Sequence, residues 1–463
     1  MLYKNMNHKN TMAELISLLK PIFGRKKDYL IVSPAWYGFG EMFESLFLAV
    51  NLARYYNKEL ILTYSNVHLR ENTNLPAICN HELKTFMVKG VGLIGNPVST
   101  ISKLLSLYIS FSRKYHKTLF GKIVRKLSGE RLLRPKIGFW GHKGEKGLQQ
   151  LLGSNRPVSW KSVLKSPIEI NLTPEQDKRG QKALLRLGIP EGKPFVCLYV
   201  RDAGFEKKHS TRMIFNHYTA DIRTYRKAIK TISDKGFYVI RMGDPSAVSI
   251  SDDGHFIDYV HTSHYSKLLD LYLYRHCTVM VCSGGGPRFA SIFYSRDTIV
   301  TNWAHIHLCG YCIGKNDVFI TKHVYSIHQD RFLCLREQLE LIDTVTDNWG
   351  FFDPNEFILV DNDEDEINQV IVEWYDRHVE GADNRDDNLQ KAFHDLRQKH
   401  TRIKFDNYKR TTGRESEHKK YFHFRPRVGN QFLEDCWEYG DYLENMTQEF
   451  NEGHQDKLKH TIG

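Results

Sequence analysis

The sequence predicts an α/β protein with two Rossmann-like domains that face a cleft and a helical C-terminal extension. Strands and helices alternate in two separate stretches, which is typical of parallel sheets with crossover helices. The length of 463 residues exceeds what one ordinary core accommodates. Hydrophobic residues make up 41% of the chain, which supplies enough apolar surface for compact domains. We therefore divide the chain into a polar leader, two domains and an extension, at 1–26, 27–172, 173–345 and 346–463.

The first domain is predicted from its opening residues. An apolar strand at 28–33 is followed by a glycine turn, a helix at 41–56 and a second strand at 59–64. Leu46, Val50 and Ala53 give the helix an apolar face, as expected for a helix packed on a sheet. A strand, a helix and a strand in this order begin a parallel layer.

The second domain is predicted from a longer series of the same kind. Its first helix, from Thr173, is capped by Thr-Pro-Glu and ends at a glycine followed by a proline. The expected strands are 195–200, 237–242, 256–260, 278–282 and 298–301. The expected helices are 173–187, 221–234, 265–275 and 287–294. An acidic patch at 361–366 opens a further helix in the extension.

Charge and cysteine content limit the class of partner. Lys and Arg total 65 against 54 Asp and Glu, a formal charge of +11, which favours partners that carry phosphates. Residues 101–136 hold ten Lys or Arg and the single acid Glu130 in a helical pattern, which suits either an anionic membrane surface or an ordinary solvated helix. The eight cysteines form no zinc-binding spacing, and His305 with His307 is read as a pair of loop histidines, so no metal is expected. With no secretory signal or spanning segment, we expect a cytoplasmic protein, which the basic helix could place on the inner face of the plasma membrane.

A glycine cluster after one strand of the second domain predicts a phosphate site. Ser283, Gly284, Gly285 and Gly286 follow the strand at 278–282, and Pro287 and Arg288 then open a helix. Glycines let backbone amides approach an anion at a helix N-terminus, and Arg288 adds positive charge there. A tight structural turn is the alternative interpretation.

Two arginines at neighbouring strand ends strengthen this prediction. Arg201 follows the strand at 195–200, and Arg241 closes the strand at 237–242. Ligands of open α/β sheets lie beyond the carboxyl ends of strands, where a guanidinium can bind a diphosphate in a forked geometry. The alternative is that Arg201 and Asp202 pair with neighbouring side chains. In the first domain, Glu41 follows a glycine turn and is a candidate general base, or alternatively an acid favoured by the helix dipole.

With these residues in view, 173–337 resembles an uncharacterised bacterial family assigned to the glycosyltransferases. The matching segments include V-R-D at 200–202, V-I-R-M-G-D at 239–244, and the stretch that contains the glycine cluster. The resemblance implies a GT-B fold that transfers a sugar from a nucleotide donor. It places these residues at the donor site: Arg201, Asp202, Arg241, Asp244, Ser283, Gly284 and Glu337. The chain departs from the family pattern in having GGGPR where Thr/Ser-Ser-Gly-Leu is more usual.

The expected function is therefore a glycosyltransferase, with Glu41 and Asp202 as the carboxylates assigned to catalysis. The donor is a nucleotide sugar held by the second domain, and the acceptor is a glycan, a lipid-linked sugar or another glycoconjugate that the first domain would bind. No cofactor, metal or nucleic acid is expected. Two alternatives stay open at this point: a sugar-nucleotide epimerase on the same scaffold, and a non-catalytic protein that binds nucleotides or nucleic acid through its basic surface.

Overall fold

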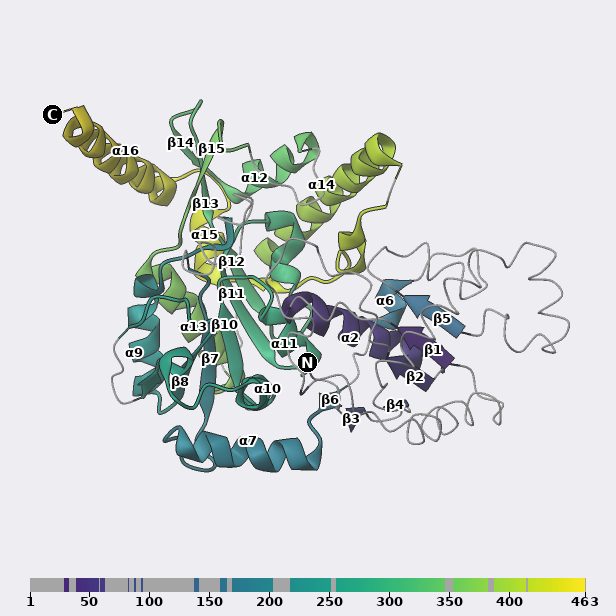
Figure 1. Ribbon diagram of the computed structural model, residues 1–463. Helices are drawn as coiled ribbons and strands as arrows, with labels where there is room; N and C mark the ends of the chain where they lie inside the picture. The colour runs from purple at the N-terminus through teal and green to yellow at the C-terminus, as the bar shows by residue number, and fades with distance from the viewer. Residues whose placement is uncertain are drawn as a thin grey trace, which may run out of the picture. The chain divides into compact units, whose positions relative to one another are not determined.

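The computed structural model is shown in Figure 1. Contacts within the chain divide it into two units, one of residues 1–177 with 293–295 and one of residues 178–292 with 296–463. The basic segment 101–136 lies outside the described residues. Those residues are 29–32, 39–57, 59–62, 82, 87–88, 93–94, 137–140, 159–164, 169–202, 217–250, 255–345, 353–381, 387–413 and 415–462.

The first unit contains a four-stranded parallel sheet in the order β4-β2-β1-β5. Helix α2 (Phe39–Tyr55) connects β1 to β2, and the side chains of Leu46, Val50 and Ala53 are buried as predicted. The other elements are a short helix, α6, and an antiparallel pair, β3 and β6. Their bounds are β1 Tyr29–Val32, β2 Glu59–Leu62, β3 Met87–Val88, β4 Leu93–Ile94, β5 Ile137–Trp140, β6 Ile170–Asn171 and α6 Trp160–Val163.

The second unit is built on a seven-stranded sheet in which every pairing is parallel, in the order β16-β12-β11-β10-β7-β8-β9. The five predicted strands are β7 to β11, so the α/β class is confirmed. The bounds are β7 Phe195–Tyr199, β8 Tyr238–Met242, β9 Phe256–Ile257, β10 Val279–Cys282, β11 Asp297–Trp303, β12 Val318–Thr321 and β16 Arg427–Val428.

Helices cover this sheet at the predicted places. Helix α9 contacts β8, α13 contacts β11 and β12, and the two helices contact each other, so they lie on one face (Figure 1). Asp221 caps the 3-10 turn η3 by accepting a hydrogen bond from the amide of Arg223 at 2.9 Å. The bounds are α7 Pro174–Arg186, η3 Ile222–Tyr225, α9 Arg226–Asp234, α10 Lys267–His276, α11 Arg288–Phe293 and α13 Glu364–His378.

One predicted strand is shorter than the sequence suggested. The run 256–260 keeps strand geometry only to Ile257, and a 3-10 turn, η4 (Tyr259–His261), follows it. The carboxylate of Asp258 accepts hydrogen bonds from Ser249 Oγ and the amide of Ile250, at 3.0 and 3.1 Å. These bonds hold Asp258 to the loop that follows β8, so the chain turns at this residue instead of continuing the ladder.

The helical C-terminal region is present, and it also contributes strands. An antiparallel sheet in the order β14-β13-β15 is formed partly by this region, and β16 adds the edge strand of the seven-stranded sheet. The remaining elements are β13 His323–Ser326, β14 Arg331–Leu333, β15 Phe357–Val360, η5 Ile306–Tyr311, α12 Leu335–Leu341, η6 Ile342–Thr344, α14 Asn388–Thr412, η7 Glu417–Lys420, α15 Asn430–Cys436 and α16 Asp441–Ile462. Within the described ranges, no helix is both long enough and apolar enough to cross a membrane.

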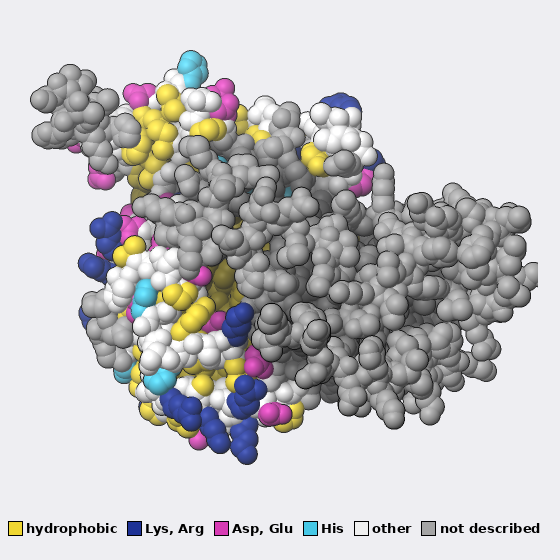
Figure 2. Space-filling view, viewed as in Figure 1, with side chains coloured by type: hydrophobic (Ala, Val, Ile, Leu, Met, Phe, Trp, Pro, Cys, Tyr) yellow, Lys and Arg dark blue, Asp and Glu magenta, His cyan; other side chains and the backbone are white. Residues whose placement is uncertain are grey.

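Helix α7 has one exposed basic face and one face that packs against α10. Its outer face carries exposed Lys178, Arg179, Lys182 and Arg186, in the region where Figure 2 shows dark blue side chains. Its inner face has Gly180, and a Cβ added there would lie 2.2–2.6 Å from the ring and Cβ of Tyr272 on α10. The helices therefore approach too closely for any side chain at Gly180.

We predict that Gly180→Ala destabilises the second unit, although alanine favours helix. Overpacking against Tyr272 costs about 1–3 kcal/mol, which exceeds the gain of at most ~1 kcal/mol from replacing a helical glycine. Gly453→Ala is the matched control because Gly453 lies in α16 with nothing within 4 Å of an added Cβ. Urea unfolding should give a lower midpoint for the first variant and an equal or higher midpoint for the second. Equal midpoints for both variants would contradict the close packing.

Candidate functional site

The candidate site lies where the order of strands in the seven-stranded sheet reverses. From β7 the chain builds outward to β8 and β9, then returns to β10 on the other side of β7. Such a switch point opens a crevice at the carboxyl ends of the strands. Tyr199 of β7 stands opposite Cys282 of β10, and the amide of Ser283 donates to the carbonyl of Tyr199 at 3.0 Å. The amide of Arg201 in turn donates to Ser283 Oγ at 3.0 Å, so the structure brings the main chain of Arg201 to the side chain of Ser283.

The glycines after β10 adopt backbone conformations that suit glycine. Gly284 and Gly285 have φ of +92° and +86°, in the left-handed region. A Cβ on Gly284 would lie 3.0 Å from the indole of Trp303, and one on Gly285 would lie 3.3 Å from the ring of Tyr199. The loop therefore presents its main chain without side chains above two aromatic rings. Gly286 continues it, and its carbonyl accepts from the amide of Phe289 at the start of the six-residue helix α11.

Aromatic side chains form a connected group beneath this loop. The rings of Tyr218 and Trp303 lie 5.7 Å apart, and the Tyr218 hydroxyl is 2.7 Å from Nε2 of His305. Trp303 Nε1 donates to the carbonyl of His305 at 2.7 Å. The guanidinium carbon of Arg201 lies 5.9 Å from the centre of the Tyr218 ring. Sequence reasoning assigned no role to Tyr218 or Trp303, although Trp303 ends a strand at the same edge of the sheet.

Arg241 and Asp202 meet each other in a buried network. Arg241 is fully buried, with Nη2 3.5 Å from Asp202 Oδ2 and Nη1 3.4 Å from Asp258 Oδ1, and it also donates to the carbonyl of Val248. Asp202 accepts from the amide of Val248 at 2.8 Å. The structure thus uses both residues to hold the loop after β8 against the switch point. Asp258, which the sequence analysis did not single out, completes the network.

Arg288 points toward the segment η5. It is buried, and its Nη1 donates to the carbonyl of Gly310 at 2.5 Å. Its guanidinium carbon lies over the rings of Phe289, Trp303 and Tyr311 at 4.5, 4.7 and 4.3 Å, where cation–π attraction replaces a carboxylate partner. Cys309, Gly310 and Tyr311 have φ of 47°, 62° and 51°, so three left-handed residues follow one another. Arg288 therefore clamps a strained turn and lends its positive charge to the same edge.

The remaining predicted residues lie in other settings. Asp244 accepts from the amide of Ser246 at 2.9 Å in the turn after β8. Glu337 belongs to the capping box of α12 and pairs with Arg331 at 2.7 and 3.0 Å, and hydrogen bonds from Arg331 lower the pKa of Glu337. The carboxylate of Glu337 is thus held by Arg331 of β14 and by the amide of Cys334 at the start of α12. Glu41 is the third residue of α2, and its side chain lies outside the described residues.

Buried histidines line the region around η5. Burial lowers the pKa of His418 to about 3, helped by the charges of Lys420 and Lys404, and burial with nearby Arg397 lowers that of His394 to about 3. Burial holds the pKa values of His305 and His307 well below their usual range. Neither ring nitrogen of His307 has a hydrogen-bond partner. These histidines are therefore neutral in the folded protein.

We predict that Gly284→Ala destabilises the protein more than the strained backbone alone explains. Gly188→Ala is the matched control, because Gly188 has a φ of +93° but nothing within 4 Å of an added Cβ, whereas Gly284 has Trp303 at 3.0 Å. The left-handed conformation costs each variant about 1–2 kcal/mol, and the Trp303 contact adds about 1–3 kcal/mol to the first. Thermal unfolding of both variants measures the difference. Equal losses of stability would show that Trp303 yields without cost.

We predict that stability falls on acidification below pH ~6.5. The four histidines bind protons on unfolding, so their stabilisation is present above their unfolded pKa and is lost as pH falls toward their folded values. Asp270 and Asp317 act oppositely, because burial raises the pKa of each to about 7 and their contribution is lost as pH rises. Four histidines therefore lower the free energy of unfolding as pH falls, and two aspartates raise it. Each proton contributes ~1.4 kcal/mol per pH unit to the slope.

The variant His307→Leu tests this sign. It removes a titrating group that has no hydrogen bond to lose among the described residues. The number of protons bound on unfolding, given by the slope of unfolding free energy against pH between 4 and 6, should therefore decrease by about one. Denaturant unfolding at several pH values supplies the slope. An unchanged slope would mean that His307 is already charged in the folded state.

No protein-family profile matches the sequence, and no curated protein matches it. Among solved structures, the chain is similar to a glycosyl transferase family 9 protein from Veillonella parvula, at 10% identity and a TM-score of 0.32, over 59% of this chain and 80% of that one. It is similar to the E. coli ADP-heptose lps heptosyltransferase II at 12% identity and a TM-score of 0.31, over 59% and 85% of the two chains. It is also similar to the NodZ alpha-1,6-fucosyltransferase co-crystallized with GDP, at 14% identity and a TM-score of 0.29, over 58% of this chain and 93% of that one. The NodZ structure soaked with GDP-fucose matches at 14% identity and a TM-score of 0.30, over 58% and 92% of the two chains. The solved structures named here thus carry glycosyltransferase names.

Proposed function

We propose that this protein is a glycosyltransferase whose second unit binds the diphosphate of a nucleotide sugar at the switch point. The observation that carries the proposal is the hydrogen bond from the Arg201 amide to Ser283 Oγ, which fixes Arg201 at the start of the loop that contains Gly284 and Gly285. An arginine and exposed amides at the carboxyl ends of parallel strands are the groups that bind phosphoryl oxygens. The V-R-D and V-I-R-M-G-D segments, which resemble a glycosyltransferase family, support sugar transfer as the use of that site.

The surroundings of the loop favour an anion over a neutral ligand. Arg288 brings a cation beneath the loop, and three aromatic rings and the carbonyl of Gly310 contact its guanidinium. The two carboxylates near the loop after β8, Asp202 and Asp258, are held by Arg241. Arg241 is therefore a positioning residue, and in the proposal Arg201 is the arginine that contacts the diphosphate.

In the proposed reaction an acceptor hydroxyl attacks C1 of the donor sugar. A bond forms between that oxygen and C1, the bond from C1 to the diphosphate breaks, and the diphosphate leaves with its electron pair. Arg201 and the loop amides would stabilise the charge that grows on the leaving group. A base takes the acceptor proton, and Glu41 is the residue that the sequence offers for that role. A glycan or lipid-linked acceptor, and a membrane surface for 101–136, belong to the same proposal and rest on the sequence alone.

We predict that Arg201→Ala weakens binding of nucleoside diphosphates about tenfold to 100-fold, because it removes charge-assisted hydrogen bonds worth ~1.5–3 kcal/mol. Arg201→Lys should recover part of that affinity, since it keeps the charge and loses the forked geometry. Arg223→Ala is the control, because Arg223 is an exposed arginine of the same unit that pairs with Asp221. Calorimetry with a panel of nucleoside diphosphates measures the affinities. Unchanged affinity in Arg201→Ala would remove the proposed diphosphate site.

An assay of the unmodified protein distinguishes a glycosyltransferase from a sugar-nucleotide epimerase. A transferase releases nucleoside diphosphate from a nucleotide sugar only slowly without acceptor, whereas an epimerase converts the nucleotide sugar alone. Product analysis of each nucleotide sugar that binds, with and without a glycan acceptor mixture, therefore distinguishes them. Conversion of the donor to an epimer without acceptor would replace the proposed transferase activity.

A further inference from the structure

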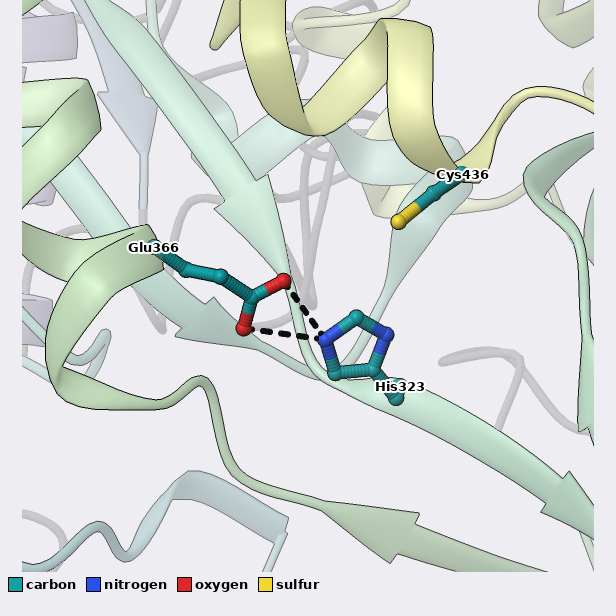
Figure 3. Close-up of side chains that lie close together, drawn as sticks. All are labelled: His323, Glu366 and Cys436. Atoms are coloured by element: carbon teal, nitrogen blue, oxygen red, sulfur yellow. Dashed lines mark hydrogen bonds and ion pairs between the residues drawn. The ribbon is translucent and has the colours of Figure 1, made fainter. Parts of the chain in front are cut away.

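Three buried side chains from distant parts of the sequence meet in the second unit, outside the switch point. They are His323 at the start of β13, Glu366 in the first turn of α13 and Cys436 at the end of α15 (Figure 3). Each is at least nine-tenths buried, and one ligand-type atom from each lies within 4.8 Å of the other two. Figure 3 shows the sulfur of Cys436 and the carboxylate of Glu366 directed toward the imidazole of His323.

The donor set and its spacing fit a divalent metal ion. His323 Nε2 lies 2.8 and 3.0 Å from the two oxygens of Glu366. Ligand atoms around tetrahedral zinc are about 3.3–3.8 Å apart, given metal–ligand bonds of about 2.0–2.3 Å. Small movements of His323 and Cys436 would therefore place all three atoms at binding distance. A thiolate, an imidazole and a carboxylate together favour zinc over calcium or magnesium, which prefer oxygen ligands.

Glu366 is already oriented as a metal ligand would be. Oε2 accepts from the amide of Asp363 at 3.1 Å and from Asn362 Nδ2 at 3.3 Å, and Oε1 accepts from the Tyr442 hydroxyl at 2.9 Å. Burial acts to raise the pKa of Glu366, but the charge and hydrogen bonds of His323 outweigh it and leave that pKa below its ordinary value. Such outer hydrogen bonds fix the orientation of ligands at metal sites. The carboxylate is thus ionised and held with both oxygens close to His323.

Cys436 is the third member of the group, and the hydrogen bonds described above do not involve its thiol. Burial raises the pKa of its thiol well above the usual range, and the charges of Glu366 and Asp435 raise it further. Its sulfur is directed toward His323 and Glu366, so a metal ion that replaced the thiol proton would be shared by all three side chains.

We propose that His323, Glu366 and Cys436 bind a zinc ion that ties β13, α13 and α15 together. The ion takes one nitrogen, one oxygen and one sulfur from the protein, with a water molecule in the fourth position. The thiol proton is released to solvent on binding, and the net charge of the ion is balanced by one carboxylate and one thiolate. The site lies outside the switch point and departs from the expectation, drawn from cysteine spacing, that the chain holds no metal.

The full-length protein, stripped with a chelator and titrated with Co²⁺, tests the proposal. One equivalent should bind and give visible bands of tetrahedral cobalt with a near-ultraviolet thiolate charge-transfer band, and Zn²⁺ should displace it. Cys436→Ser should abolish the charge-transfer band. Cys277→Ser, which removes another buried cysteine of the same unit, should keep it. Absence of stoichiometric binding, a band that survives in Cys436→Ser, or a band lost equally from both variants would overturn the proposal.

The wild-type protein gives a second readout that does not depend on the folding of a variant. Since the thiol must lose its proton, the affinity for Zn²⁺ should rise about tenfold or more per pH unit through the neutral range. The thermal midpoint of the stripped protein should also rise on addition of Zn²⁺, because the ion binds the folded state. A pH-independent affinity, or an unchanged midpoint in the presence of one equivalent, would count against ligation by Cys436.

Discussion

The close approach of the Gly284 main chain to the indole of Trp303 is the constraint on which the carboxyl edge of the large sheet depends. Glycine suits this position because its φ is +92° and an added Cβ would lie 3.0 Å from the ring. That approach places the loop after β10 above the end of β11, and Trp303 in turn contacts Tyr218 and His305. The hydrogen bond from the Arg201 amide to Ser283 then joins β7 to the same arrangement. The close packing at Gly284 thereby brings together the carboxyl ends of β7, β10 and β11.

Two buried arginines near this edge are stabilised in different ways. Arg241 lies between the carboxylates of Asp202 and Asp258, so its desolvation is offset by opposite charge and hydrogen bonds. Arg288 has aromatic faces and a carbonyl around it instead. The first cation is balanced by opposite charge, whereas the second is stabilised by cation–π attraction and by a hydrogen bond. Arg288 thereby joins the start of α11 to the turn at Cys309–Tyr311, whose three residues have positive φ.

The sequence predicted the fold more fully than the site. Apolar runs and glycine turns located β7 to β11 and the helices between them, because hydrophobic period and turn chemistry are local properties. The partner of a charged side chain is not local. Arg241 and Asp202 are 39 positions apart, and no pattern along the chain states that they meet each other instead of a ligand. Asp258 belongs to the same network, and its bonds end β9 at Ile257, before the residue at which the sequence predicted the strand to end. The meeting of His323, Glu366 and Cys436 spans more than 100 positions and three elements, so spacing rules for zinc ligands could not find it.

The edge position of β16 has a consequence for synthesis of the chain. Val428 pairs with Phe319 and Arg427 with Val318, so the outermost ladder of the large sheet joins residues more than 100 positions apart. A ribosome that has released β7 to β12 has not yet produced the strand that covers the free hydrogen-bonding edge of β12. During that interval the nascent chain exposes an unpaired apolar strand, and protection of that edge by a chaperone or by rapid translation would govern the yield of native protein.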